Sequence, residues 1–143
     1  QANFNMLDIR VVASGLLQKL NDLGAGLIAR TPLAFGFLAG VLTGEETFSP
    51  QDHRSRWSRE QIRLWAMGAR DLLACCEESC ESPAYEVALR FCLSYPQVST
   101  TIAGMLTPAE VASNVLASEA GPLSLESCAQ IEALHKTRQF FLN

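Results

Sequence analysis

One stretch of the chain constrains its fold more than any other: a β-branched run, a glycine and a capped helix start follow one another directly. Residues 98–103 (VSTTIA) have the length and the β-branched content of a buried strand. Gly104 then permits a sharp turn or the close approach of a ligand. Thr107, Pro108 and Glu110 suit the N-cap, the first and the third helical positions, as in a capping box. The stretch therefore predicts a strand that turns directly into a helix.

A turn of this kind can bind an anion, because the helix start offers free N–H groups and the positive end of the helix dipole. Phosphate sites of this type occur after the last two strands of β/α barrels, although an ordinary βα loop has the same pattern. A second apolar strand, residues 26–29, ends near Thr31, since the residue before Pro32 is disfavoured in a helix. Gly36 and Gly40 keep the following turn free of bulk. The sequence thus predicts two strands, each followed by a glycine-containing turn.

Three segments of the chain resemble motifs of the aldo-keto reductase family. Residues 31–38 (TPLAFGFL) are similar to the S-P-L-A-x-G-x-L run after the family's seventh strand. Residues 1–7 (QANFNML) are similar to its strand-six pattern Q-x-x-Y-N-L-L. The family's run P-G-x-x-x-x-x-Q-x-x-E-N after strand eight is matched at Gly104, Thr107, Pro108, Val111 and Asn114. The resemblance covers nearly the whole chain and implies an α/β fold, the C-terminal part of a (β/α)8 TIM barrel from strand six onward.

The resemblance also implies a cofactor site. Members of the family bind NADPH extended across the C-terminal face of the barrel and pass a hydride to an aldehyde or ketone. In this chain Gln1 would hold the nicotinamide carboxamide, and Arg30 would lie against the nicotinamide ring. The pyrophosphate would be wrapped, largely through backbone N–H groups, by Thr31, Pro32, Leu33 and Ala34. The adenosine end would be surrounded by Gly104, Met105, Leu106, Glu110, Ser113 and Asn114.

Two further arginines are candidates for phosphate contact. Arg54 and Arg56 lie in a long polar loop, residues 41–57, and a planar guanidinium suits phosphate oxygens. A loop of this length is uncommon in a compact domain unless it is functional or disordered. The alternative is that both belong to a solvated run of charges. For Arg30 the alternative is an ion pair with a carboxylate.

The sequence departs from residues common in the family at Val41, Leu106, Glu110 and Ser113. A carboxylate at Glu110 would repel the 2′-phosphate of NADP by simple Coulomb interaction. The capping box is nevertheless a sufficient structural reason for Glu110. The resemblance implies NADP as the cofactor, and NAD is the alternative.

The residues that carry the family's chemistry are not matched. Its catalytic aspartate, tyrosine, lysine and histidine lie on the first four strands or the loops after them. Tyr85 and Tyr95 fall in a predicted helix, residues 83–95, where packing is the better interpretation. Since such a barrel needs about 250 residues, the 143 residues are expected to be a single partial domain, residues 1–143, that has no catalytic residue of its own.

Two functions remain open from the sequence. In the first, the chain is the cofactor-binding portion of a carbonyl reductase that takes a small substrate only with a missing N-terminal half. In the second, it is a non-catalytic cofactor-binding or interaction module, similar to the potassium-channel β subunits that share the fold. In both cases the isolated chain is expected to be inactive and to self-associate, because a partial barrel leaves strand edges unpaired.

The composition is that of a soluble globular protein, with 48% hydrophobic and 18% charged residues. A net charge of −4 argues against nucleic acid as a partner, and no apolar run approaches the ~18 residues of a membrane span. Five cysteines are expected to be buried and reduced, in a cytoplasmic protein. Cys76 and Cys80 share one predicted helical face, but the C-x-x-C spacing of zinc sites and a nearby histidine are lacking, so no metal site is expected.

The remaining periodicity is helical. Apolar residues recur at helical spacing over residues 11–23, which are ended by Gly24. A second helix opens at Ser58, where Gln61 at the third position predicts another capping box. Further helices are predicted to start at positions 83, 107 and 124.

Overall fold

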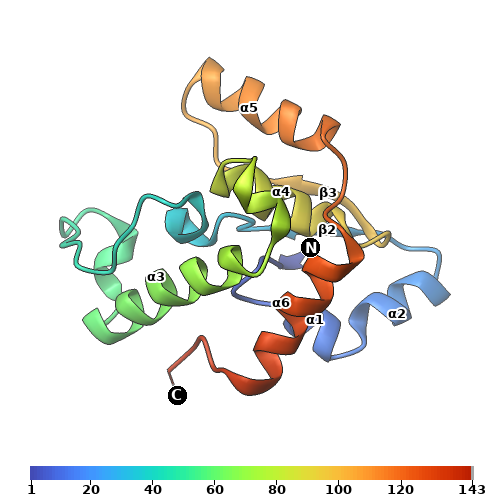
Figure 1. Ribbon diagram of the computed structural model, residues 1–143, viewed down its shortest axis with the longest axis horizontal. Helices are drawn as coiled ribbons and strands as arrows, with labels where there is room; N and C mark the ends of the chain where they lie inside the picture. Colours follow the sequence, from blue (N-terminus) through green and yellow to red (C-terminus); the bar gives the residue numbers. More distant parts are fainter. Residues whose placement is uncertain (143) are drawn as a thin grey trace.

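The computed structural model describes residues 1–142 as an α/β fold built on a three-stranded parallel sheet (Figure 1). The strands are β1 (Ala2–Asn3), β2 (Leu27–Arg30) and β3 (Val98–Ile102), and they lie in the order β1-β2-β3. Consecutive parallel neighbours joined by helical crossovers are the arrangement of a β/α barrel. The predicted strand-to-helix turn is present between β3 and α5, and the glycine-containing turn predicted after residues 26–29 is present after β2.

Residues 1–142 contain six α-helices. They are α1 (Arg10–Ala13), α2 (Leu16–Asp22), α3 (Arg59–Ala74), α4 (Ala84–Leu93), α5 (Pro108–Glu119) and α6 (Leu125–Thr137). The described part of the chain also has three short 3-10 helices: η1 (Ala34–Ala39), η2 (His53–Arg56) and η3 (Glu77–Cys80). Within residues 1–142, every helix is too short or too polar to cross a lipid bilayer.

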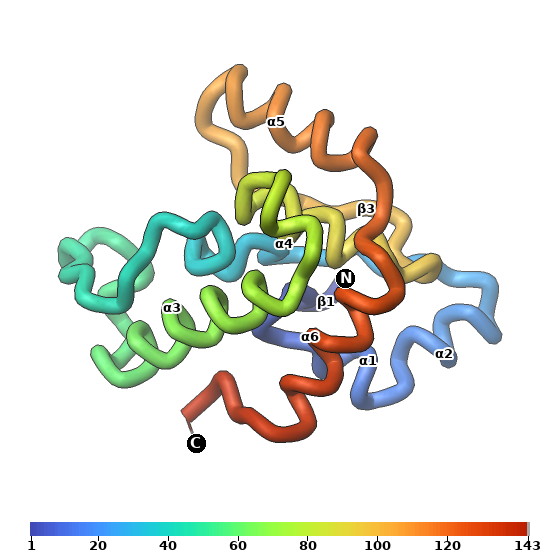
Figure 2. Tube along the Cα trace, in the orientation of Figure 1, coloured from blue at the N-terminus to red at the C-terminus, as the bar shows by residue number. Residues whose placement is uncertain are grey.

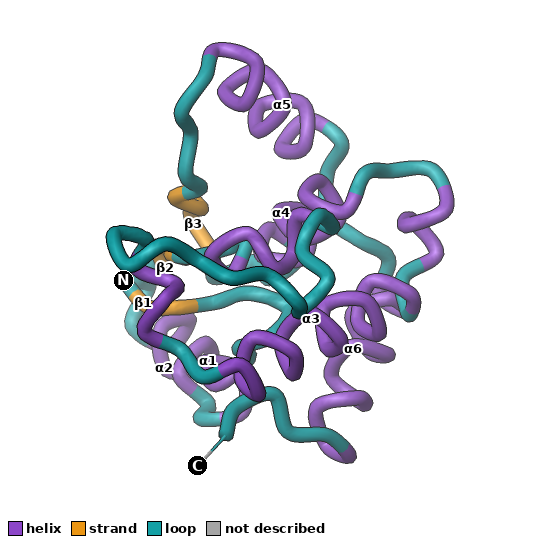
Figure 3. Tube along the Cα trace, turned by 90° about the vertical axis from the view of Figure 1, so that its left-hand side faces the viewer, coloured by secondary structure: helices purple, strands orange, loops and turns teal. Residues whose placement is uncertain are grey.

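Helix α4 is the centre of the packing. It contacts β3 on one side and α5 on the other, so that α5 lies at the periphery of the fold (Figures 1 and 3). The ring centroid of Phe4 lies 5.5 Å from that of Phe91 on α4 and 5.1 Å from that of Tyr95. Phe4 is fully buried at the end of β1. This apolar cluster fixes the sheet against α4, and it confirms that Tyr95 packs into the fold.

The strand predicted at residues 98–103 is present as β3 (Val98–Ile102), but the prediction that it is buried is wrong. Along β3 only Val98 is buried, and Ile102 keeps 48% of its surface exposed. On β2, Leu27 and Ala29 are buried while Ile28 and Arg30 are exposed, as expected for a strand covered on one face. The sheet is therefore covered on one face, and its other face carries exposed apolar side chains.

Two helix predictions also need correction. The helix expected over residues 11–23 is broken into α1 and α2, because Gly15 adopts a left-handed conformation with φ 72°. At the start of α3, Ser58 accepts a hydrogen bond from the Gln61 N–H, but the Gln61 side chain does not return to Ser58. Its Nε2 donates to the Phe140 carbonyl and its Oε1 accepts from the Leu142 N–H, at 3.0 and 2.8 Å. Gln61 therefore holds the C-terminal tail against α3 instead of closing a capping box. The trace in Figure 2 shows this tail running below α3.

The cysteines are free within residues 1–142, but they are not all buried as expected. Cys76 and Cys92 are buried, Cys75 and Cys128 are half-buried, and Cys80 is exposed. Burial raises the pKa of the Cys76 thiol to about 12, so this thiol stays protonated. Cys76 precedes η3 and Cys80 ends it, so the two do not share an α-helical face. In the described part of the chain, no three His, Cys, Asp or Glu side chains are grouped so as to hold a metal ion.

Candidate functional site

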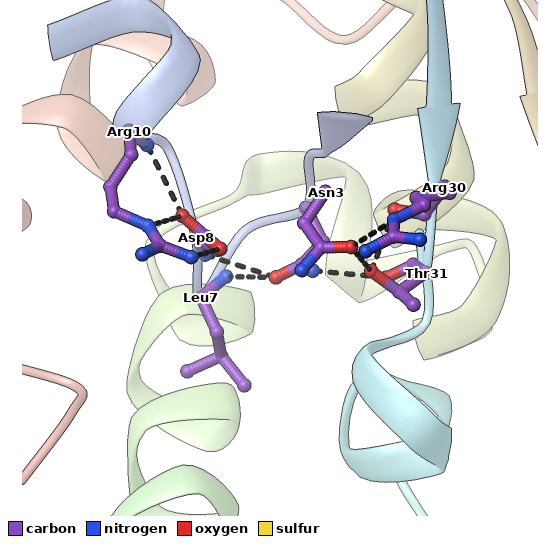
Figure 4. Close-up of polar contacts among 7 residues, drawn as sticks. Asn3, Leu7, Asp8, Arg10, Arg30 and Thr31 are labelled. Atoms are coloured by element: carbon purple, nitrogen blue, oxygen red, sulfur yellow. Dashed lines mark hydrogen bonds and ion pairs between the residues drawn. The ribbon is translucent and has the colours of Figure 1, made fainter. Parts of the chain in front are cut away.

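The ends of β1 and β2 are joined by side-chain hydrogen bonds (Figure 4). Asn3 Oδ1 accepts from Arg30 Nε at 2.6 Å and from the Thr31 hydroxyl at 3.3 Å. Arg30 thus uses one N–H on an amide oxygen, and it forms no ion pair with a carboxylate among residues 1–142. The alternative of an Arg30 ion pair is not realised. The guanidinium is left exposed at the end of β2.

A second set of bonds shapes the loop after β1. Asn5 is buried; its Oδ1 accepts from the N–H groups of Leu7 and Asp8, and its Nδ2 donates to the Thr31 carbonyl at 2.9 Å. Asp8 in turn holds Arg10 through contacts of 2.6 and 2.8 Å (Figure 4). The side chain of Asn5 therefore fixes the backbone at Thr31, where the chain leaves the sheet.

The loop after β2 has an unusual backbone. Three residues other than glycine have positive φ: Thr31 at 55°, Ala34 at 45° and Phe35 at 59°. Gly36 follows with φ 97°. A non-glycine residue held in this region costs roughly 1–3 kcal/mol and persists where the surroundings impose it, often at ligand sites. The strain marks this loop as a candidate functional segment.

The same backbone can receive an anion. Leu33 has near-helical angles and Ala34 is left-handed, which is the sequence of conformations that forms an anion-binding nest of N–H groups. The N–H groups of Ala34 and Gly36 are used within the loop, on the carbonyls of Thr31 and Leu33. Among residues 1–142, the N–H groups of Leu33 and Phe35 have no hydrogen-bond acceptor. These two donors remain for a ligand.

The two loop arginines differ. Arg54 is bound to Asp52 through contacts of 2.6 to 3.1 Å, donates to the Phe35 carbonyl at 3.4 Å, and lies over the Phe48 ring. Its hydrogen bonds lower the pKa of Asp52 to about 2, so the pair is charged at neutral pH. Arg54 therefore fixes the loop and is not a solvated charge. Arg56 is exposed, stacks on Trp57, and forms no ion pair with the described residues.

A small cavity joins the loop after β2 to the helix after β3. It measures about 190 Å³ and is lined by Leu33, Ala39, Tyr85, Gly104, Glu110, Ser113 and Asn114. The amide nitrogen Nδ2 of Asn114 is buried there without a hydrogen-bond acceptor among residues 1–142. A buried amide without a partner costs free energy. An unpartnered amide in a residue that lines a cavity makes Asn114 a candidate site residue.

The start of α5 is capped as predicted. The Thr107 hydroxyl accepts from the Glu110 N–H, and Glu110 Oε2 accepts from the N–H groups of Leu106 and Thr107 at 2.5 and 3.0 Å. The capping box is therefore confirmed, and the Glu110 carboxylate is already engaged by the backbone. Three backbone N–H groups at this helix start, those of Leu106, Thr107 and Glu110, are therefore occupied by the protein itself.

The structure brings together some of the predicted site residues but not all. Leu33, Gly104, Glu110, Ser113 and Asn114 line the small cavity. Thr31, Ala34 and Arg56 line a second cavity of about 320 Å³ at the ends of β1 and β2. Neither cavity is lined by Gln1, Arg30, Pro32, Arg54, Met105 or Leu106. Pro32 is fully buried, and Leu106 is 94% exposed.

Sequence reasoning missed several residues of these walls. Tyr85 was expected only to pack, yet it lines the small cavity beside Asn114. Trp57, Trp65 and Phe141 line the second cavity, although they are far apart in the sequence. Asn3 and Asn5 lie close together in the sequence near the end of a strand. Asparagine side chains at such positions often hydrogen-bond the backbone of a loop, so the sequence did contain a signal for these two residues.

Comparison with known proteins places this fold. The model of the aldo/keto reductase family matches residues 1–136. No curated protein matches the sequence. The structure is similar to the holo form of the aldo-keto reductase AKR11C1 from Bacillus halodurans, with 24% identity and a TM-score of 0.63 over 92% of this chain. It is also similar to the apo form of that protein, with 25% identity and a TM-score of 0.62.

The chain spans 39% and 41% of the length of these two structures. Its parallel sheet and helices thus correspond to part of an aldo-keto reductase barrel. The family match covers nearly all of the sequence, and the fold agrees with it. The chain belongs to the aldo/keto reductase family.

Proposed function

We propose that this chain binds a nicotinamide dinucleotide across the loops that follow β2 and β3, as the cofactor-binding portion of an oxidoreductase that reduces aldehydes or ketones. The observation that carries the proposal is the buried Asn114 Nδ2 in the wall of the small cavity. An adenine ring offers ring nitrogens as acceptors for such an amide. The site fits the group because its unpartnered atom is a donor.

The loop after β2 supports the phosphate part of the proposal. The free N–H groups of Leu33 and Phe35 lie in a strained segment that begins where β2 ends. Leu33 also lines the small cavity, so the phosphate and adenosine ends of a dinucleotide would be contiguous there. A Cβ at Gly104 would meet no atom within 4 Å, so this glycine borders open space beside the cavity. The bound cofactor would supply the hydride; the chain's own residues hold and orient it.

Replacing Asn114 with Ala tests the adenosine end. The variant should bind NADPH about 1–2 kcal/mol more weakly, which is the usual cost of a lost polar contact. Stability should change little, because Nδ2 has no partner in the described protein. Fluorescence titration with NADPH measures the affinity, with the exposed Asn21→Ala on α2 as the control. Equal affinities for both variants and the unaltered protein would exclude Asn114 from the site.

Replacing Glu110 with Gln tests the choice between NADP and NAD. Glutamine retains the oxygen that caps α5 but removes the charge. Only NADPH carries a phosphate near this position under the proposal, so the affinity for NADPH should rise relative to NADH. The gain should be about 1 kcal/mol or less, because two charges 4 Å apart in water interact by about 1 kcal/mol. The control is Glu119→Gln at the far end of α5. An unchanged NADPH/NADH ratio would mean that capping is the whole role of Glu110.

A second candidate is a non-catalytic cofactor-binding or interaction module of the same fold. The observation that favours it is the state of Tyr95, whose hydroxyl donates to Glu132 Oε1 at 2.7 Å within the packed fold. That phenol is committed to a structural hydrogen bond. Cofactor binding by this chain does not separate the two candidates, and neither does turnover by the isolated chain, which is expected to be inactive in both cases. Turnover by a complete barrel that contains this chain would favour the reductase.

A further inference from the structure

The segment that contains β3 and α5 carries the whole net charge of the chain. Residues 91–134, which include β3, α5 and most of α6, contain four glutamates and no aspartate, lysine, arginine or histidine. Their formal charge is therefore −4, and the remaining 11 acidic and 11 basic residues cancel. A ligand that lies along β3 and α5 meets an acidic surface, which disfavours any additional negative charge on that ligand.

The start of α5 is already occupied by a carboxylate of the protein. Glu110 Oε2 accepts from the N–H groups of Leu106 and Thr107, and the Glu110 N–H donates to the Thr107 hydroxyl. Pro108 has no N–H, so Ala109 alone keeps a backbone donor at this helix start without an acceptor among residues 1–142. The carboxylate also lies at the positive end of the helix dipole. A phosphate could bind here only by displacing Glu110.

The wall of the small cavity offers a ligand an acceptor and no cation. The cavity is lined by one carboxylate, Glu110, and by no lysine, arginine or histidine of the described residues. The capping bonds use Oε2 of Glu110, so Oε1 has no hydrogen-bond donor among residues 1–142. An ionised carboxylate oxygen only accepts hydrogen bonds. The free oxygen therefore suits a ligand hydroxyl and repels a ligand phosphate.

The other elements that form the cavity wall do not supply a cation either. Helix α4 contributes Tyr85 to the wall, and its one basic residue is Arg90. Arg90 donates to the Gly121 and Pro122 carbonyls at 2.9 and 3.1 Å and forms an ion pair with Glu86. The 3-10 helix η1 contains no basic residue. Within residues 1–142, the charge of Glu110 in this wall is therefore not neutralised by a neighbouring arginine or lysine of these elements.

We propose that this site prefers NAD(H) to NADP(H), with Glu110 Oε1 as the acceptor for a hydroxyl of the adenosine ribose. NADP differs from NAD by a phosphate on the ribose 2′-hydroxyl. In Rossmann-type sites a carboxylate binds this hydroxyl when the cofactor is NAD, and an arginine accommodates the phosphate when it is NADP. The small cavity has the carboxylate and, among the described residues, lacks the arginine. The inference rests on the proposed function, which places the adenosine end at this cavity, and it departs from the NADP that the resemblance implies.

Two effects contribute to the expected preference. Repulsion between two unit charges about 4 Å apart in water weakens binding about fivefold, and a phosphate monoester carries about −1.5 to −2 charges at pH 7. The 2′-phosphate also removes the hydroxyl that Glu110 would accept, which weakens binding by a further factor of several. The dissociation constant of NADPH should therefore be at least about tenfold that of NADH. Added salt should reduce this ratio, because it screens exposed charges.

Calorimetric titration of one protein sample with NADH and with NADPH measures the ratio of the two dissociation constants. Ser113→Arg then tests whether this cavity sets the ratio. Ser113 lines the cavity and lies three residues after Glu110 on α5, so an arginine there offers the 2′-phosphate a cation. The NADPH/NADH ratio of dissociation constants should fall about tenfold in this variant. The matched control, Ser118→Arg, adds the same charge at an exposed position of α5 outside the cavity, and should change the ratio by less than about twofold.

The outcomes separate this inference from the proposed function. If NADPH binds as tightly as NADH or more tightly, the inference is overturned, whereas the proposed function stands because a dinucleotide binds. If Ser113→Arg and Ser118→Arg change the ratio equally, the preference does not arise in this cavity and the role of Glu110 is refuted. If neither cofactor binds, the proposed function fails and the inference fails with it. If Ser113→Arg does not fold, the salt dependence in the unaltered protein decides, since a ratio that salt does not reduce rules out charge repulsion.

Discussion

The purified 143-residue chain should not oxidise NADPH when an aromatic aldehyde is supplied. Reduction of a carbonyl needs a proton donor within hydrogen-bond reach of the developing alkoxide, and such a donor contributes about 10²–10⁴-fold to the rate. Tyr95 is unsuited, because burial and its bond to Glu132 raise the pKa of its hydroxyl. Tyr85 lines the cavity that we assign to the adenosine end. No tyrosine of the described residues lies in the cavity at the ends of β1 and β2.

The rate of NADPH oxidation is measured from the decrease of NADPH absorbance over time in a mixture of the purified chain, NADPH and the aldehyde. A fluorescence titration of the same sample serves as the control, because cofactor binding without turnover shows that the sample is folded. Steady consumption of NADPH by the purified chain would contradict this prediction. It would also show that a residue outside the family's known catalytic pattern can donate the proton.

The isolated chain should also associate with itself through the free edge of β3. Within residues 1–142, β3 pairs only with β2, and its other edge has no strand partner. Near this edge Ile102 is 48% exposed, and α5 exposes Val111, Val115 and Leu116 to a similar extent or more. An unpaired edge beside exposed apolar surface invites pairing with another chain. The isolated chain should therefore be dimeric or larger, or incompletely folded.

Light scattering combined with a thermal melt measures this. Ile102→Lys places a charge at the edge and should lower the average mass, because edge lysines oppose strand pairing. The matched control is Leu125→Lys on α6, since Leu125 is 90% exposed but lies away from the sheet. A monodisperse monomer of the unaltered chain with a sharp cooperative melt would refute the prediction.

Much of the fold could be predicted from local patterns. The strand, glycine and capped helix from Val98 onward were predictable because each step depends on a few neighbouring residues. The break at Gly15 could not be predicted from apolar spacing alone, since Leu16, Leu17 and Leu20 keep helical spacing beyond it. The exposure of β3 depends on which other elements pack against it. The pattern of residues within the strand does not predict these elements.

The site was harder to predict because its walls come from distant segments. Phe141 and Trp65 are 76 positions apart and meet only because Gln61 holds the C-terminal tail. Tyr85 faces a cavity although its spacing with Ala88 is that of a packed stripe. The positive φ angles of Ala34 and Phe35 could not be predicted from their residue types. Tertiary contacts impose them, so only the structure locates the free N–H groups.

The claim that a dinucleotide lies across the loops after β2 and β3 is tested most directly by amide NMR during titration with NADPH. If the dinucleotide lies there, the signals of the Leu33 and Phe35 backbone amides and of the Asn114 side-chain amide should shift saturably. These donors have no protein partner among residues 1–142, so a ligand bound there should change their hydrogen bonding. Saturable shifts elsewhere in the chain, with these three signals unmoved, would contradict it.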